Sequence, residues 1–467
     1  MLKNLIWDYF GKFSSALMQV VTSLILMKLL EPSDFGLIGM TLAVNSFALT
    51  FTNFGFSSYI IQQPKEDIEL QSSIFWFNLL LGISITALII FTSQTIANFY
   101  HLQQLKNIII ICGLFIPIGL LISIPNALLS KRLQFKQINL RNIIVAFVCA
   151  IVGISAALLG FGVWALVVQQ GLNLLFNLLA SYKSANWLPK FIFDRLKFKR
   201  AFNFGKYIFL ANLVESVYSR LDVFTIGKIF SLEIVGYYTR AQSLSGNVIH
   251  MSSNSLLNVL FPVLTKKKDD KPELIKNYFV YLHHICFVFC LLSSFCFLFA
   301  QIAFITFFKP TWSYAAVLFK IIILSSVVIP LSDLMLSILQ ARGNSRNYFV
   351  ADVWKKVVLY PTYIILFYYS IEVYLYTTFF GFLLALLINL YFLNKEIEVG
   401  YIKTIKIFLS YFIPTIILSF ILDYFIPTSS SWIFSLTKFM IVLMALSLSL
   451  KIFPSPTIQL ILQKIKK

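Results

Sequence analysis

The sequence predicts an all-α integral membrane protein with about fourteen transmembrane helices. Three observations lead to this fold class. Of the 467 residues, 59% are hydrophobic and only 12% are charged, whereas a soluble domain is about 25% charged. Apolar runs of about 20 residues, the length that crosses a bilayer, recur along the chain. Basic residues are dispersed into the short loops between these runs, which is the pattern that orients membrane proteins.

The predicted spans follow one another with short connections. They cover residues 9–30, 36–61, 73–97, 108–129, 142–159, 163–182, 202–230, 236–264, 277–307, 314–340, 348–369, 373–393, 404–424 and 432–452. Pro117, Pro125, Pro330 and Pro414 fall inside spans. Because proline removes a backbone hydrogen bond, we expect these spans to bend there.

The charges of the loops place both termini in the cytoplasm. On one side of the membrane, Lys106 and Lys309 are the clear basic loop residues. The opposite side carries the basic clusters, including Lys131, Arg132, Lys136 and Arg141 in one loop and the whole of 183–200. By the positive-inside rule the basic side is cytoplasmic, and an even number of spans agrees with this. The external loops are too short for a catalytic domain.

Charge and cysteine usage exclude several functions. The net charge of +19 is spread over many loops and forms no basic patch, so we expect no nucleic-acid partner. All five cysteines lie inside apolar runs and are predicted to be small buried side chains with no metal or redox role. The chain has no Gly-rich phosphate loop, so we expect no bound ATP and no cofactor.

A repeat predicts two lobes. Residues 28–36 and 228–236 each close a hairpin turn and end in a glycine, Gly36 or Gly236, that begins the returning helix. Six spans separate the two copies, so both copies run in the same direction, and such parallel repeats are typical of transporters. The predicted division is an N-terminal lobe at 1–182, a basic cytoplasmic linker at 183–200, a C-terminal lobe at 201–394, and a helix pair with a basic tail at 395–467. We expect the two pseudo-symmetric six-helix lobes to surround a central cavity.

One polar ribbon stands out among the spans. Its members are Arg240, Ser243, Asn247, His250, Asn254 and Asn258. They fall within an arc of about 80° on one helix, as the 3.6-residue period dictates. Hydrogen bonding between packed helices is one interpretation. Six polar positions on one face favour the other, a hydrophilic cavity wall, to which we also assign Asp333 of the tenth span.

Three further strings resemble a known family. They are Leu29-Leu30-Glu31-Pro32-Ser33-Asp34-Phe35-Gly36, the group Arg220-Leu221-Asp222 with Gly236-Tyr237-Tyr238, and Leu339-Gln340-Ala341-Arg342-Gly343-Asn344. The chain is similar here to bacterial polysaccharide flippases of the Wzx type, within the multidrug/oligosaccharidyl-lipid/polysaccharide (MOP) exporter superfamily. The C-terminal spans are the least alike.

This resemblance implies a function. The expected protein lies in the bacterial cytoplasmic membrane. It moves an oligosaccharide on an undecaprenyl pyrophosphate carrier from the inner to the outer leaflet by alternating access, with H⁺ or Na⁺ as the driving ion. Membrane lipid, a polysaccharide polymerase and chain-length proteins are the further partners that the resemblance implies.

Arginines and amides in this region suit such a substrate. Arginine binds phosphate through several donors at once, so we assign the pyrophosphate to Arg220 and Arg240. Sugar hydroxyls are assigned to Asn247, Asn254 and Asn258. In the structural alternative, Arg220 pairs with Glu215 or Asp222, and Arg240 reaches the outer membrane surface.

Ion coupling is assigned to three titratable residues. Glu215 and Asp222 share one helical face, and a carboxylate in a semi-dry cavity is a plausible proton carrier. His250 titrates near neutrality. The alternatives are an ion pair for Glu215, a solvated position at the cavity mouth for Asp222, and a simple hydrogen-bonded helix histidine for His250.

Two rival functions remain from the sequence. One is a multidrug or cation exporter of the same superfamily. The other is a membrane enzyme such as a polysaccharide polymerase or ligase. Such enzymes place catalytic groups in large external loops, and the short loops here favour a transporter that is not an enzyme.

Overall fold

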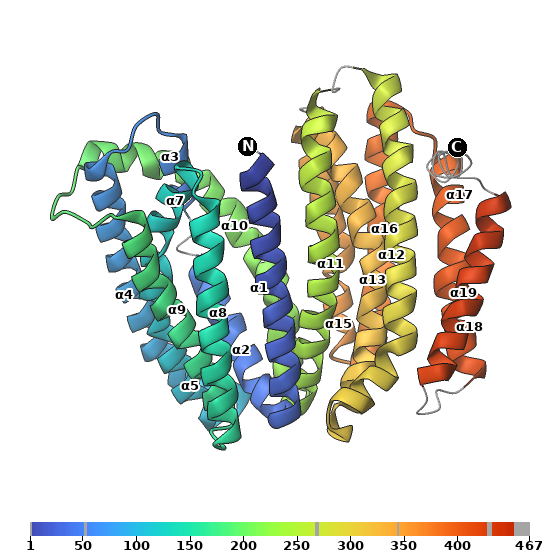
Figure 1. The fold of residues 1–467 in the computed structure, drawn as a ribbon, viewed down its shortest axis with the longest axis horizontal. Helices are drawn as coiled ribbons and strands as arrows, with labels where there is room; N and C mark the ends of the chain where they lie inside the picture. Colours follow the sequence, from blue (N-terminus) through green and yellow to red (C-terminus); the bar gives the residue numbers. More distant parts are fainter. Residues whose placement is uncertain (1, 51–53, 267–269, 343–344, 427–431, 453–467) are drawn as a thin grey trace. The chain divides into compact units, whose positions relative to one another are not determined.

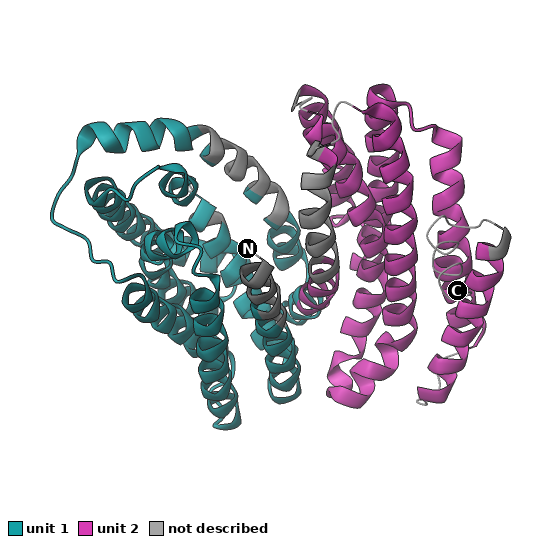
Figure 2. Ribbon diagram, turned by 45° about the horizontal axis from the view of Figure 1, so that its top comes forward, with its two compact units in different colours: residues 1–239 teal, residues 240–467 magenta. Residues whose placement is uncertain are grey.

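A computed structural model describes residues 2–50, 54–266, 270–342, 345–426 and 432–452. Within these ranges, some side chains lie outside the description: those of 2–10, 12–13, 16, 47–48, 207–208, 210–215, 217–219, 250–263, 265–266, 345 and 451–452. Every secondary-structure element of the described chain is a helix, and none of these residues lies in a strand. It divides into two compact units, Met1–Thr239 and Arg240–Lys467, which Figure 2 colours separately.

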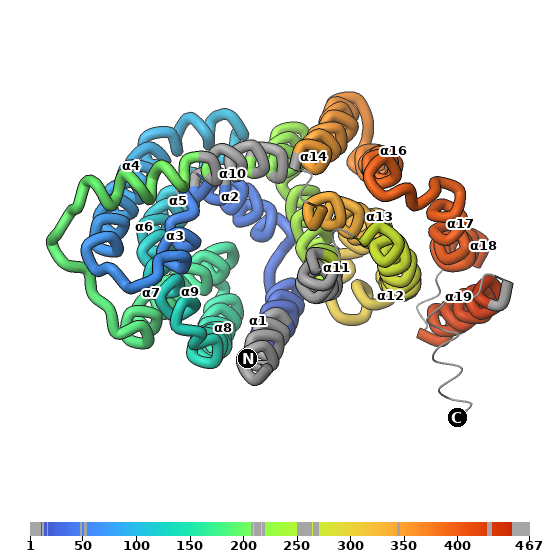
Figure 3. The backbone as a smooth tube through the Cα atoms, turned by 90° about the horizontal axis from the view of Figure 1, so that it is seen from above, coloured from blue at the N-terminus to red at the C-terminus, as the bar shows by residue number. Residues whose placement is uncertain are grey.

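Unit 1 contains the first ten helices and the start of the eleventh. They are α1 (Leu2–Leu29), α2 (Pro32–Thr50), α3 (Phe56–Gln62), α4 (Ile68–Tyr100), α5 (Gln103–Gly113), α6 (Phe115–Leu121), α7 (Ser123–Lys131), α8 (Phe135–Leu158), α9 (Val163–Ala185), α10 (Arg195–Ile229) and α11 (Leu232–Lys266). Within this unit α1 lies along α8, and α8 lies along α9 (Figures 1 and 3).

Unit 2 contains the rest of α11 and the remaining helices. They are α12 (Lys271–Phe307), η1 (Pro310–Trp312), α13 (Ser313–Ala341), α14 (Ser345–Leu359), α15 (Thr362–Ile365), α16 (Ile371–Ile397), α17 (Tyr401–Phe412), the π turn η2 (Ile413–Ile417), α18 (Leu418–Phe425) and α19 (Trp432–Ile452). Helix α13 packs against both α12 and α16 and forms the centre of this unit. Its side chains are mostly buried, including Leu318, Ile323 and Leu334.

The described residues hold nine helical segments long and apolar enough to cross a membrane. They correspond to nine of the predicted spans: the third to sixth, the ninth, the tenth and the last three. The protein is therefore a multi-pass, all-helical membrane protein. Helices α1, α2, α10, α11 and α14 stand at the other five positions, but they are not among the nine segments found in the described residues, so the total of fourteen and the orientation stay predictions.

Two predicted proline bends are confirmed in the fourth span. The span is divided into α5, α6 and α7, with breaks after Gly113 and Leu121. Each break lies four residues before a proline, Pro117 or Pro125. The ring of a proline clashes with the carbonyl four residues earlier, which explains both positions. Pro414 likewise lies in the π turn η2, whereas Pro330 is accommodated inside α13.

The predicted second span at 36–61 is wrong as a single helix. Helix α2 ends at Thr50, and α3 begins at Phe56. Between them Gly55 adopts a left-handed conformation with φ 64°. Glycine adopts this conformation without a steric penalty, whereas most other residues do not. A residue in this conformation cannot continue a right-handed helix. Apolar composition alone does not reveal this interruption.

The connections of unit 1 gather at two opposite ends. At one end, Asp34 after α1, Gln104 after α4 and Gly162 after α8 line a common cavity. At the other, the Nζ atom of Lys131 donates to the carbonyl of Lys65 at 3.0 Å, and Arg132 donates to the carbonyl of Ala185 at 2.6 Å. In unit 1, the odd-numbered and the even-numbered connections between the predicted spans thus lie at opposite ends. A chain that crosses the membrane repeatedly requires this arrangement.

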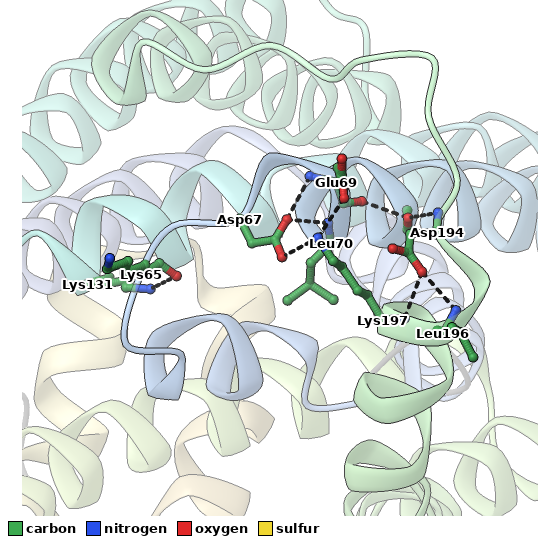
Figure 4. A network of polar contacts seen from close by, with 9 residues as sticks. Lys65, Asp67, Glu69, Leu70, Lys131, Asp194, Leu196 and Lys197 are labelled. Carbon is green, nitrogen blue, oxygen red and sulfur yellow. Dashed lines mark hydrogen bonds and ion pairs between the residues drawn. The ribbon is translucent and has the colours of Figure 1, made fainter.

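The basic linker is tied to the N-terminal end of α4 (Figure 4). Lys197 Nζ lies 2.8 Å from Asp67 Oδ2 and 2.6 Å from Glu69 Oε2. Backbone amides of Lys190 and Asp194 donate to Ser72 and Ser73 of α4 at 3.0 and 2.8 Å. The carboxylate of Asp194 in turn caps α10 by accepting from two of its first backbone amides. These contacts fix where α10 begins, seven residues before the predicted seventh span.

Candidate functional site

Helix α11 carries the predicted polar ribbon on an unbroken backbone from Leu232 to Lys266. Ser243 is exposed, and Arg240 and Asn247 are partly buried. Ala241, Ser245 and Ile249, which point elsewhere on the helix, are buried. The described part of the ribbon is therefore the less buried face of α11. The side chains of His250, Asn254 and Asn258 lie outside the described residues.

Asp222 of α10 is hydrogen-bonded to Tyr238 of α11. The Tyr238 hydroxyl donates to Asp222 Oδ2 at 2.5 Å, and the amide of Val223 donates to Asp222 Oδ1 at 2.7 Å. Asp222 is only 6% exposed. This burial excludes the alternative of a solvated residue at the cavity mouth. The Asp222 carboxylate, which is held by these two donors, joins α10 to α11 inside unit 1.

Arg220 does not pair with Asp222. Among the residues that the structure describes, Arg220 is partly buried and forms no ion pair. A turn of 200° separates positions two residues apart on a helix, so the two side chains leave α10 in different directions. The side chain of Glu215, the other predicted partner, lies outside the described residues.

Asp333 is partly buried on α13, beside a polar seam that sequence reasoning missed. Ser332 next to it is buried and accepts a hydrogen bond from Asn389 of α16. Ser293 of α12 donates to the Ile323 carbonyl of α13 at 3.0 Å. These bonds link three helices across the centre of unit 2. An asparagine in an apolar run such as 373–393 is the signal that could have indicated the seam.

A cavity of about 310 Å³ lies at one end of unit 1. Asp34, Gln104, Asn107 and Trp164 contribute polar and aromatic side chains to it. Gly160 and Gly162 form part of the wall and have positive φ angles of 82° and 53°. Asp34 belongs to the hairpin string that carries the family resemblance, and it had no assigned role from the sequence.

Arg141 was counted among the loop residues, and that assignment is wrong. It lies inside α8, which begins at Phe135, and it is only 8% exposed. Its Nη2 atom donates to Asn126 Oδ1 at 2.9 Å and to Asn142 Oδ1 at 3.0 Å. Proximity to Arg132 and Lys136 in the sequence suggested a loop because helix α8 starts earlier than the apolar run does.

The five cysteines are all free thiols in the described chain. Cys112, Cys149, Cys286 and Cys290 are buried as predicted, and Cys296 is partly buried. No group of three or more metal-binding side chains occurs among the described residues.

The model for the family described as polysaccharide biosynthesis protein matches residues 25–317. The chain belongs to this family. Among curated proteins, the chain is 24% identical to the succinoglycan biosynthesis transport protein ExoT of Rhizobium meliloti, over 58% of this chain and 54% of that one. It is 24% identical to the lipopolysaccharide biosynthesis protein WzxC of Escherichia coli, over 56% and 53%. These alignments span about half the length of the two relatives.

A third relative of this polysaccharide biosynthesis family aligns almost completely. A membrane protein of the cps region of Klebsiella pneumoniae is 23% identical over 93% of this chain and 91% of its own length. The resemblance to Wzx-type flippases is confirmed by the family model and by these relatives.

Two solved structures define the fold of this family member. The lipid II flippase MurJ in an inward closed conformation superposes with a TM-score of 0.75 at 14% identity, over 96% of this chain and 98% of that one. An inward-facing multidrug resistance MATE transporter of the MOP superfamily has a TM-score of 0.63 at 13% identity, over 82% and 94%. At such low identity these matches establish the MOP fold and nothing about substrate.

Proposed function

We propose that the protein is a flippase for undecaprenyl-pyrophosphate-linked oligosaccharides. It moves them from the inner to the outer leaflet of the bacterial cytoplasmic membrane by alternating access of two six-helix lobes. The polar face of α11 carries the proposal, because Arg240 and Asn247 offer charge and amide groups on the less buried side of a helix within this fold. The names of ExoT, WzxC and MurJ support transport of saccharide units or lipid-linked precursors.

In this proposal the guanidinium groups of Arg220 and Arg240 bind the pyrophosphate. Charge-assisted bonds to phosphate are among the strongest hydrogen bonds in proteins. The amide of Asn247 serves sugar hydroxyls together with Asn254 and Asn258, and Asp333 contributes from α13. The lobes comprise 1–182 and 201–394, and the helix pair at 395–467 follows them. Polysaccharide polymerase and chain-length proteins receive the product.

Coupling to H⁺ or Na⁺ is assigned to the acidic side chains of α10, with His250 as a further candidate. Asp222 is the better supported of the two because it is buried and bound by Tyr238. Loading and release of a cation at such a carboxylate changes the net charge of a dry region. Because of that change in charge, the cation-bound and cation-free states favour different conformations.

Translocation in proteoliposomes tests this function. The purified protein is reconstituted with a fluorescent undecaprenyl-pyrophosphate oligosaccharide, and the inner-leaflet fraction is followed by quenching from outside. We expect protein-dependent translocation that accelerates under an imposed H⁺ or Na⁺ gradient. Protein-free liposomes are the control. Unchanged leaflet distribution under every gradient would refute the proposal.

A multidrug or cation exporter is the second candidate, because the MATE fold also superposes on this chain. Efflux of a fluorescent cation such as ethidium from the same proteoliposomes would favour that function. A membrane polymerase or ligase would instead lengthen or transfer the oligosaccharide, which thin-layer chromatography of the recovered lipid would detect. We expect neither efflux of ethidium nor a lengthened or transferred oligosaccharide.

A further inference from the structure

Arg141 is a buried cation inside α8. Among the residues that the structure describes, it has no carboxylate partner, and its hydrogen bonds all go to the neutral amides of Asn126 and Asn142. Burying an unpaired charge is costly, so buried arginines normally have an acidic partner. The described acidic side chains of unit 1 therefore do not neutralise the buried charge of Arg141.

The unused donors of Arg141 are concentrated on one atom. A guanidinium has five N–H groups. The Nε and Nη2 atoms donate to the two asparagines, whereas Nη1 is buried and has no hydrogen-bond partner in the described chain. Most buried polar atoms in native proteins have a partner, and one that lacks it calls for an explanation. An anion supplied by a bound molecule would satisfy both the charge and Nη1.

The surroundings favour a polar head group. Asn126 and Asn142 are partly exposed and hold the guanidinium from the side of α7 and α8. The neutral amides of Asn126 and Asn142 beside Arg141 can donate to phosphate oxygens, and they add no competing negative charge.

The position along the membrane favours a lipid-borne group. Arg141 lies six residues after the first residue of α8, or about 9 Å along the helix axis. That end of unit 1 is the one where the basic loops meet around Arg132 and Lys197. With the orientation that the positive-inside rule gives, this depth corresponds to the head-group side of the inner leaflet.

We propose that Arg141, held by Asn126 and Asn142, binds the phosphate of a lipid head group at the inner-leaflet end of unit 1. The inference deepens the proposed function: the lipid is either the substrate's pyrophosphate carrier on its way in or an anionic membrane lipid. Planar guanidinium donors match two phosphate oxygens at once, which an ammonium group does not.

Thermal shift of the full chain in nanodiscs tests this site. Discs of phosphatidylcholine alone are compared with discs that contain undecaprenyl pyrophosphate and with discs that contain phosphatidylglycerol. For the wild-type protein we expect a dose-dependent rise in melting temperature in at least one phosphate arm, and the arm that produces it identifies the lipid. For Arg141→Gln we expect the half-saturating lipid fraction to rise by about tenfold or more. Arg141→Lys retains part of the response, and Arg200→Gln, an exposed arginine of the same unit, retains all of it.

The melting temperature without phosphate lipid separates binding from a structural role. Removing a buried charge that lacks a counter-charge should leave this temperature unchanged or raise it. A purely structural arginine predicts that Arg141→Gln and Asn126→Ala both lower it and that the lipid response persists. Equal responses of Arg141→Gln and the wild-type protein in both arms overturn the inference. Translocation by the wild-type protein is scored separately, so a phosphate site in a protein that does not translocate would refute the proposed function alone.

Discussion

Gly36 and Gly236 each lie against the backbone of the other's hairpin. A Cβ atom on Gly36 would be 2.1 Å from the carbonyl oxygen of Leu232, and one on Gly236 would be 1.8 Å from the carbonyl oxygen of Pro32. Both distances are far inside van der Waals contact. Leu232 precedes Gly236 by four residues and Pro32 precedes Gly36 by four, so the two contacts are equivalent. This reciprocity supports the repeat that the sequence predicts between 28–36 and 228–236.

Alanine at either glycine should destabilise the protein. The added methyl group meets a backbone carbonyl that cannot rotate away, so α2 and α11 must separate. We expect Gly36→Ala and Gly236→Ala each to cost about 1–3 kcal/mol or more, the usual range for overpacking. Melting in detergent, followed by size-exclusion chromatography, measures the loss. Gly119→Ala is the matched control, because a Cβ there meets nothing within 4 Å; equal melting of all three variants would contradict this packing.

The ion pair between Glu66 and Arg132 should make a small, pH-dependent contribution to stability. The hydrogen bonds from Arg132 lower the pKa of Glu66 below 4.5, against the opposing effect of burial. Since the folded-state pKa is the lower one, the stabilisation is present above about pH 4.5 and is lost as the pH falls through the folded value. The side chains are 38% and 30% exposed, so solvent limits the contribution to at most about 1 kcal/mol.

A double-mutant cycle of Glu66→Gln and Arg132→Gln measures this coupling. The cycle is needed because Arg132 also bonds the Ala185 carbonyl. We expect a positive coupling energy at pH 7 that becomes smaller as the pH is lowered towards 3. Equal coupling at the two pH values would show that the interaction does not depend on the charge of Glu66.

Asp423 of α18 should stabilise the packing of the last two helices, α18 and α19, against α13 within unit 2. Its Oδ2 lies 2.6 Å from Lys320 Nζ of α13, and its Oδ1 lies 3.5 Å from Lys438 Nζ of α19. Lys438 has only 1% of its side chain exposed. Asp423→Asn leaves the buried ammonium group of Lys438 and the partly buried one of Lys320 without a carboxylate, and we expect a cost of about 3–5 kcal/mol.

Lys438→Met provides the contrast. It removes the more distant and more buried cation and leaves the short Lys320–Asp423 pair intact. We therefore expect Lys438→Met to melt at or above the wild-type temperature. If both variants were equally destabilised, loss of the Lys438 contact alone would account for the whole effect, and the shorter Lys320–Asp423 contact would not be the dominant one.

Asp222→Asn should uncouple transport from the ion gradient. The amide keeps the size of the carboxylate and can still accept from Tyr238, so folding should be largely preserved. It cannot bind and release a proton, and it lacks the negative charge that attracts a metal cation. We expect translocation by this variant to be insensitive to an imposed gradient, whereas Tyr238→Phe should keep a gradient response with an altered pH profile. A full gradient response in Asp222→Asn would remove Asp222 from the coupling mechanism.

Apolar runs and proline positions were sufficient to predict the helical fold and several of its interruptions. Pro117 and Pro125 act on their own helix, so the sequence contains the whole cause of those breaks. Gly55 is different, because glycine permits a left-handed conformation but does not require one. The position of the linker around Asp194 could not be predicted from the sequence either, because its hydrogen-bond partners Ser72 and Ser73 lie more than a hundred residues away.

The candidate site was predictable as a helical face and not as a set of contacts. The ribbon through Arg240 and Asn247 follows from helical periodicity. The bond between Asp222 and Tyr238 joins two helices, and the burial of Arg141 depends on where α8 begins. Both depend on packing that no local pattern encodes.

The rate of lipid-linked oligosaccharide translocation by Arg240→Gln tests the central claim most directly. Proteoliposomes with matched amounts of folded wild-type protein, Arg240→Gln and the exposed-surface control Arg346→Gln are compared without a gradient. If the polar face of α11 binds the moving pyrophosphate, Arg240→Gln should lower the rate by about tenfold or more, and the control should match the wild-type protein. Wild-type rates in Arg240→Gln would contradict the assignment of this face to the substrate path.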